Sequence, residues 1–282
     1  MNHTRVFFFF LFIGLFQFGY SQGYGRKTKD AFPDQPRFEK KFWYFDLGAN
    51  YTLPIINKKE IDGLQIADTL YRTNPSQKGK LGAAVNFGRY HMINNLYFFR
   101  YWNYGLSYSW IRGEESFKDE RIINGTPTEY NSGNNTFSNH FVGAHIEING
   151  RNKLSDKSFI QHTLGLNASY AVASKQSYNH TVLGIEENSS SRFHSSIYYK
   201  LGWGIRASKK LIVIPSVAIP VFNIYSFNSG RMDMPYFNSN YWPITFSIRF
   251  MLCQPYRMKT CPPVDAIGVP EGYQDNGGGE KK

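Results

Sequence analysis

The chain has 282 residues, of which 19% are charged and 17% are aromatic, and its formal net charge is +11. This length is sufficient for one or two domains. The mean hydropathy of −0.43 excludes a bundle of transmembrane helices, and so few charged side chains beside so many aromatic ones are unusual for an ordinary soluble protein.

Residues 1–21 are typical of an export signal. One basic side chain lies within residues 1–5, residues 6–18 form an apolar run, and residues 19–21 supply a small-x-small cleavage site. The run is shorter than the ~20 residues that a transmembrane helix requires. We therefore predict a cleaved signal peptide over residues 1–21, with an uncleaved anchor helix as the alternative, and a basic periplasmic lead-in over residues 22–41.

Eight later segments alternate apolar and polar residues with a period of two, which is the period of a β-strand. In the first segment Leu47 and Tyr51 share one face, whereas Asp46, Asn50 and Thr52 share the other. The seventh segment is the least regular. In chain order the segments are residues 42–53, 80–90, 97–111, 139–149, 159–172, 193–206, 210–221 and 241–252.

The linkers between these segments are short and long in turn. Those after the second, fourth and sixth segments are short, and those after the first, third, fifth and seventh are long and polar. An even number of strands joined in this way is typical of a membrane-spanning β-barrel. We predict an all-β fold over residues 42–252: a closed eight-stranded antiparallel up-and-down transmembrane β-barrel with long outer loops and short periplasmic turns.

A soluble barrel would alternate equally well, but with its apolar face inside. Its polar face would then meet water and should carry Lys and Glu, whereas here that face is mostly Gly, Ser, Asn and Thr, which fit a narrow lumen. Aromatic residues near the segment ends form the expected girdles. We place Trp43 and Phe250 at the periplasmic rim and Trp110 and Trp242 at the outer rim.

The chain continues beyond the last segment. Residues 253–282 are charged and rich in Pro and Gly, so we predict a flexible periplasmic tail. Cys253 and Cys261 are the only cysteines, and an even pair in an oxidising compartment suggests a disulfide. Two thiols without a nearby His do not make a zinc site.

With these features the chain resembles the small outer-membrane β-barrel proteins of the Bacteroidota. The resemblance rests on the Phe-rich signal that ends at residues 19–22, on the alternating strands, and on residues 244–250 (ITFSIRF), which look like an aromatic-ended assembly signal. In that family the last strand usually ends the chain, whereas a tail follows here. The resemblance implies a place in the outer membrane of a Gram-negative envelope.

Charged residues on the polar face should meet inside such a barrel. An eight-stranded barrel is just wide enough for side chains, so we expect these charges to pair. The first and last strands become neighbours on closure, which predicts an ion pair between Asp46 and Arg249, with Glu147 and Arg206 in the same layer. The alternative is a narrow solute channel lined by such groups. The charged residues on this face are Asp46, Lys80, Glu147, Lys200, Arg206 and Arg249.

Some small membrane barrels are enzymes that act on the acyl chains of lipid A or phospholipids through Ser, His and an acid. His194 and Ser196 share one face of a segment, and residues 186–187 (Glu-Glu) lie in the preceding linker. These residues supply only part of a catalytic arrangement, and the motifs of the known lipid A deacylases and palmitoyltransferases are absent from the sequence. We therefore expect His194 and Ser196 to be polar residues that fill the lumen.

The sequence favours a non-catalytic role, either presenting outer loops or serving as an accessory of an envelope complex. A lipid-modifying enzyme and a narrow channel are the alternatives. The excess of positive charge suits outer-membrane lipids and an anionic lipopolysaccharide leaflet, and an exported protein rarely meets nucleic acid. Another envelope protein is a further expected partner. We predict no cofactor and no metal site.

Overall fold

The computed structural model describes residues 41–55, 60–93, 99–155, 157–179, 191–208, 210–225 and 233–253. None of these residues forms a helix long and apolar enough to cross a membrane. Their strands are β1 (Lys41–Ile55), β2 (Ile61–Ile66), β3 (Thr69–Gly79), β4 (Ala84–Met92), β5 (Phe99–Ile123), β6 (Thr126–Lys153), β7 (Ser158–Ser177), β8 (Phe193–Arg206), β9 (Leu211–Tyr225), β10 (Met234–Tyr236) and β11 (Ser239–Leu252). Residues 1–40 and 254–282, with the predicted signal peptide and tail, lie outside the described part.

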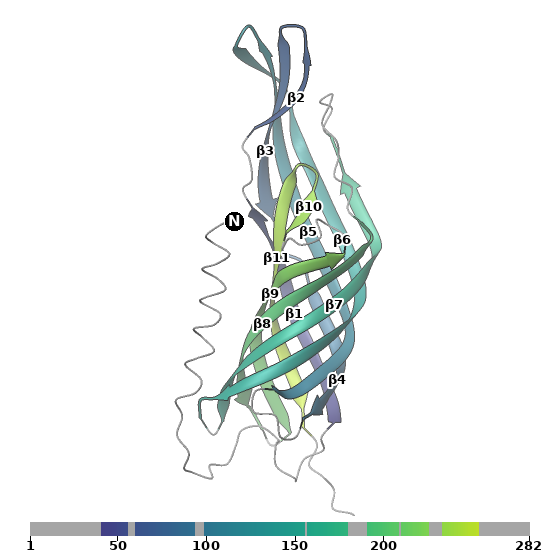
Figure 1. The fold of residues 1–282 in the computed structure, drawn as a ribbon, viewed down its shortest axis with the longest axis vertical. Helices are drawn as coiled ribbons and strands as arrows, with labels where there is room; N and C mark the ends of the chain where they lie inside the picture. Colours follow the sequence, from purple (N-terminus) through teal and green to yellow (C-terminus); the bar gives the residue numbers. More distant parts are fainter. Residues whose placement is uncertain are drawn as a thin grey trace, which may run out of the picture.

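Eight of the strands form a ring in which each pair of neighbours is antiparallel. The order is β1, β4, β5, β6, β7, β8, β9 and β11, and β11 pairs again with β1 (Figure 1). These strands correspond to the eight predicted segments. The antiparallel all-β fold is therefore confirmed.

The apolar face of the ring points outward. Leu47, Leu106 and Trp203 expose 50%, 65% and 54% of their surface, whereas Asp46 and Asn50 expose 1% and 2%. Because side chains alternate along each strand, the polar residues of the predicted segments fill the interior. The outward apolar side chains also include Val85, Phe87, Val142, Ile146, Ile148, Leu164, Leu166, Leu201, Val217, Phe246 and Ile248.

The prediction of a long polar loop after the third segment is wrong. β5 and β6 have 25 and 28 residues, far more than predicted, and pair with each other as far as Ile123 and Thr126. Asn124 and Gly125, at φ values of 50° and 79°, form the turn between them. This pair suits a two-residue hairpin turn, which needs two positive φ angles. The sequence pattern missed these strands because both of their faces carry polar residues there.

The linker after the first segment also contains strands. β2 and β3 form a hairpin, and β3 pairs with the distal part of β5 from Gly79 opposite Gly113 to Thr69 opposite Ile123. These strands stand beyond the end of the ring that lies opposite the short turns (Figure 1). We name β2, β3 and residues 113–137 of the β5–β6 hairpin the extension. Beside its base, β10 pairs with the start of β11.

Two apolar clusters occupy the interior near its two ends. The lower cluster, near the short turns, consists of Tyr44, Tyr90, Tyr101, Phe159, Ile212, Ile214, Met251 and Cys253. The upper cluster, at the base of the extension, consists of Ile111, Phe137, Phe141, Ala171, Met234, Tyr236, Phe237 and Tyr241. A polar layer lies between them. The disulfide predicted between Cys253 and Cys261 stays a prediction, because Cys261 lies outside the described residues. The Cys253 thiol is buried and forms no disulfide with a described residue.

Candidate functional site: a charged layer in the ring interior

Asp46 and Arg249 meet in the middle of the ring. The register of β1 and β11 sets the two residues directly opposite each other. The Arg249 guanidinium donates through Nε to Asp46 Oδ1 at 2.7 Å and through Nη2 to Asp46 Oδ2 at 2.8 Å. Both side chains expose only 1% of their surface. This geometry is the two-pronged arginine–carboxylate pair, which is stronger than a single charged hydrogen bond.

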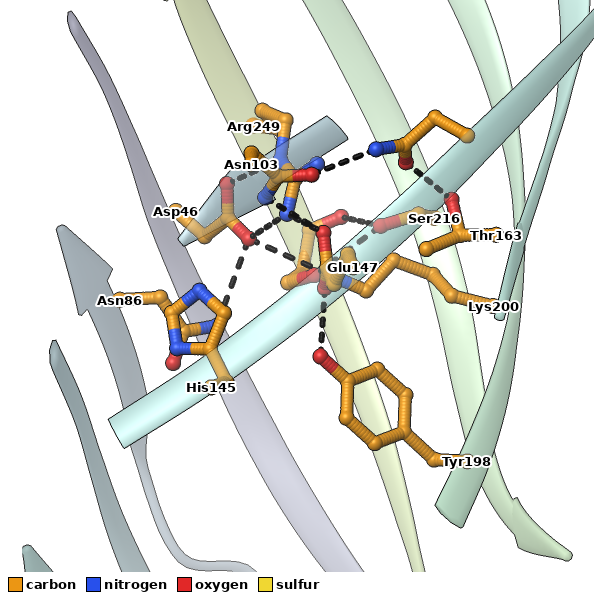
Figure 2. Close-up of polar contacts among 12 residues, drawn as sticks. Asp46, Asn86, Asn103, His145, Glu147, Thr163, Tyr198, Lys200, Ser216 and Arg249 are labelled. Carbon is orange, nitrogen blue, oxygen red and sulfur yellow. Dashed lines mark hydrogen bonds and ion pairs between the residues drawn. The ribbon is translucent and has the colours of Figure 1, made fainter. Parts of the chain in front are cut away.

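Glu147 and Lys200 complete the charged layer (Figure 2). Glu147 Oε2 accepts from Arg249 Nη2 at 2.7 Å, and its Oε1 accepts from Lys200 Nζ at 2.8 Å. The Lys200 ammonium also lies 3.3 Å from Asp46 Oδ2. The layer thus holds two carboxylates and two cations in alternating contact, with no net charge. Such balance is needed because an unpaired buried charge is costly.

Neutral donors satisfy the remaining lone pairs of the carboxylates. Glu147 accepts from Asn103 Nδ2 at 2.8 Å and from the Tyr198 hydroxyl at 2.6 Å, while Asp46 accepts from Asn86 Nδ2 at 3.3 Å. These donors come from β4, β5 and β8 and surround the charged layer (Figure 2). Buried ionic groups are tolerated when hydrogen bonds complete their shells, so the layer is a stable structural feature.

The charged layer differs from the predicted one at one position. Arg206 does not take part, and its Nε donates to the Ser208 carbonyl oxygen at 3.4 Å, near the end of β8. Lys200 takes its place in the layer. Lys200 lies six residues earlier on the same face of β8, about 20 Å from Arg206 along the strand, and this is the level at which Asp46 and Glu147 lie. Lys80 is also outside the layer: it forms an ion pair with Glu114, Nζ to Oε2 at 2.6 Å, at the base of the extension.

Aromatic side chains pack against the charged layer on the side of the short turns. The ring of Tyr44 lies under the guanidinium of Arg249, with Cζ 4.5 Å from the ring centroid. Tyr101 donates its hydroxyl to Gln161 Oε1 at 2.7 Å, and Tyr90 donates to the Leu252 carbonyl oxygen at 2.6 Å. All three tyrosines are fully buried. The interior at this end is therefore filled with side chains.

A small cavity lies on the other side of the charged layer. Its volume is about 130 Å³, and its wall includes Asn50, His145, Asn167 and Ser196. Nδ1 of His145 has no hydrogen-bond partner among the described residues. A polar cavity of this size suits a few water molecules, which need two or more polar partners each. It is too small for the acyl chain of a lipid.

His194 and Ser196 both lie buried on the wall of this cavity. Nε2 of His194 pairs with Asn223 Oδ1 at 3.2 Å, and its ring contacts that of Phe141. A catalytic His is usually oriented by a carboxylate, whereas this contact is to an amide. Residues 186–187 lie outside the described part of the chain. Among the described residues, no three His, Cys, Asp or Glu side chains gather as metal ligands.

The four predicted girdle residues lie on the outward face. Trp43 stacks on Phe87 with centroids 5.0 Å apart, and Phe250 stacks on Phe45 at 4.8 Å. The indole N–H of Trp110 donates to Ser138 Oγ at 2.8 Å. That of Trp242 donates to the Pro220 carbonyl oxygen at 3.2 Å.

A further buried carboxylate, outside the charged layer, fastens the extension to the ring. Glu115 is fully buried and accepts hydrogen bonds from the Ser239 hydroxyl, from the Asn238 backbone N–H at 3.2 Å and from Asn135 Nδ2 at 3.3 Å. Burial raises the pKa of Glu115 above its ordinary value, against the opposing effect of these donors. In contrast, the hydrogen bond from Lys80 lowers the pKa of Glu114.

No family model matches the chain, and no curated protein matches it significantly. The resemblance to Bacteroidota outer-membrane proteins therefore stays a prediction. The function has to be argued from the outward apolar face, the filled interior and the extension.

Proposed function

We propose that this protein is a closed eight-stranded transmembrane β-barrel of the outer membrane, and that its role is non-catalytic. The observation that carries the proposal is the outward apolar face of the ring. Contiguous apolar surface of this extent is rare on a soluble protein, because it drives aggregation in water. A band of outward apolar side chains around a polar interior suits hydrocarbon, and closure leaves no unpaired strand edge within it.

The orientation follows from the connections. In bacterial barrels the short turns face the periplasm and the long connections lie outside. The turns between β4 and β5, β6 and β7, and β8 and β9 are then periplasmic, and the extension stands outside the cell. The export signal predicted at residues 1–21 supports a location beyond the inner membrane.

We infer that the barrel serves as a membrane anchor and that the extension binds a partner. The charged layer, which has no net charge, and the two apolar clusters occupy the interior except for the small cavity, and this favours a rigid support over a channel. In the extension, β2, β3 and the distal parts of β5 and β6 make an antiparallel sheet outside the ring with largely polar surfaces. Such a platform suits contact with another envelope protein or with lipopolysaccharide sugars.

The experiment is a comparison of the full protein with a variant in which an Asn-Gly turn replaces residues 114–136. The variant keeps the eight strands of the ring and loses the distal β5–β6 hairpin, with which β3 pairs in the extension. We expect both proteins to resist unfolding in cold SDS and to be protected by vesicles against protease, whereas only the full protein should retain an envelope partner on native purification.

Two outcomes would contradict this role. Single-channel steps from the full protein in a planar bilayer would favour the narrow channel. A lipid A mass profile that changes on deletion of the gene, and is restored by the full protein but not by a His194→Ala variant, would favour the enzyme.

A further inference from the structure

Cations and aromatic rings alternate on one side of the outward face, near the short-turn end. Lys41 lies opposite His91, which lies opposite Trp102. One step further from the rim, Trp43 lies opposite Arg89, which lies opposite Tyr104. We name these six residues of β1, β4 and β5 the rim patch.

The rings and cations of the rim patch contact one another. The Arg89 guanidinium carbon lies 4.8 Å from the ring centroid of Trp43. His91 stacks on Trp102 with centroids 4.6 Å apart, and Trp102 stacks on Tyr104 at 5.4 Å. Lys41 and Arg89 are exposed. The Trp43 ring therefore holds the Arg89 guanidinium in place at the surface, and the Lys41 ammonium is exposed on the same strand as Trp43, so both cations can meet a ligand.

No described carboxylate on the outward face competes for the cations of the rim patch. Among the described residues of the short-turn half of the ring, the only acidic side chains are Asp46 and Glu147, and both are buried in the charged layer. The three strands that follow β1 on its other side differ, because the outward residues at the same level of β11, β9 and β8 are apolar. They are Trp203, Ile205, Leu211, Val213, Phe250 and Leu252.

We propose that the rim patch binds the head group of an anionic glycerophospholipid in the adjacent leaflet. The Lys41 ammonium and the Arg89 guanidinium would receive the phosphate oxygens, and the aromatic rings would lie at the interfacial level. The acyl chains would follow Phe87 and Leu106, which are paired neighbours that expose 51% and 65% of their surface. This inference rests on the proposed membrane location.

A neutral choline lipid lacks the net charge that the two cations favour. Each Lys or Arg near an anionic surface strengthens binding by about fivefold. We therefore expect the protein to prefer phosphatidylglycerol to phosphatidylcholine by more than about fivefold at low salt. The preference should fall as the salt concentration rises.

The test measures quenching of tryptophan fluorescence by brominated lipids in vesicles that contain the full protein. Mixtures of brominated phosphatidylglycerol with ordinary phosphatidylcholine give the relative affinity of the two lipids. Lys41→Gln with Arg89→Gln should bring the ratio close to one, whereas Lys41→Arg with Arg89→Lys should keep it. Lys210→Gln, in the turn before β9, is the matched control and should leave the ratio unchanged.

The outcomes separate this inference from the membrane assignment. Equal quenching by both lipid classes in the unaltered protein would overturn the rim patch as a binding site and leave the barrel in the membrane. A preference that survives the double glutamine change would overturn it as well. The absence of any quenching by brominated chains would instead contradict the membrane location. Cold-SDS mobility identifies any variant that fails to fold. If the double glutamine variant fails, the lipid preference of Lys41→Arg/Arg89→Lys is compared with that of the unaltered protein, and a loss of the preference would overturn the inference.

Discussion

Removal of Asp46 should strongly destabilise the protein, because it isolates a buried guanidinium. Nη1 of Arg249 already has no partner among the described residues, and its Nε and Nη2 both donate to Asp46. In Asp46→Ala the guanidinium keeps the hydrogen bond from Nη2 to Glu147 at 2.7 Å and the Tyr44 ring beneath it, but it loses both hydrogen bonds to Asp46. Breaking a buried pair by removing one partner costs about 3–5 kcal/mol.

The double variant Asp46→Ala/Arg249→Met should recover most of this loss. It removes one charge of each sign and leaves Glu147 paired with Lys200 at 2.8 Å, so the interior stays neutral. Replacing a whole buried pair by apolar groups is often neutral or stabilising. The free energies of unfolding of the two single variants should therefore not add, and the double variant should be more stable than either.

The extension offers a matched control for Asp46. Asp62 pairs with Arg72 at the same Nε to Oδ1 distance, 2.7 Å, but the Asp62 side chain is 57% exposed. Asp62→Ala should cost about 1 kcal/mol or less, because exposed ion pairs contribute little.

Urea unfolding in lipid vesicles, followed by tryptophan fluorescence, gives the free energies, and cold-SDS mobility checks folding. A loss below about 1 kcal/mol in Asp46→Ala, or strict additivity in the double variant, would show that the buried pair with Arg249 does not stabilise the protein in this way.

The protease resistance of the extension should fall as the pH rises from about 4 to 7. Burial raises the pKa of Glu115 in the folded state, so the contribution of this group to stability is complete below the ordinary glutamate pKa and is lost as the pH rises through the folded value. Glu115→Gln should flatten this pH dependence, and an unaltered pH profile in the variant would count against it. Gly125→Ala should cost about 1 kcal/mol and act only at the tip of the β5–β6 hairpin, since its φ is 79°; amide exchange should show faster opening there and no change in the ring. Gly165→Ala should cost about 1–3 kcal/mol in the same urea assay, because the new Cβ would collide with the ring of Tyr198. If the collision is the cause, Gly165→Ala/Tyr198→Ala should have the same free energy of unfolding as Tyr198→Ala alone. An unchanged free energy of unfolding in Gly165→Ala would exclude the collision.

Period-two patterning predicts the strands of the ring well, because one face of each strand is buried. The sixth segment, residues 193–206, has the same bounds as β8. The same pattern does not predict the extension. Its buried residues include Glu115 and Asp119, so apolar and polar residues do not alternate along these strands. The pair Asn124 and Gly125 was the one local signal for its hairpin.

The charged layer could be predicted only in part. Asp46 and Arg249 follow from the closure of β1 on β11, which the order of the strands implies. The choice of Lys200 over Arg206 depends on the stagger between strands around the ring, which a single sequence does not specify. The short turns on their own do not fix that stagger, because an error of a few residues at each strand accumulates.

The proposed membrane location depends above all on whether the outward face contacts hydrocarbon or water. Single spin labels at Leu106, Val142, Leu164 and Ile248, in a background without the two cysteines, would be examined in vesicles for collisions with oxygen and with a water-soluble nickel chelate. All four sites lie outward on the ring, and Lys118 in the extension, with a side chain 66% exposed, is the aqueous control. We expect oxygen access and exclusion of nickel at the four sites, with the reverse at Lys118. Free access of nickel to all four would contradict the proposed membrane location.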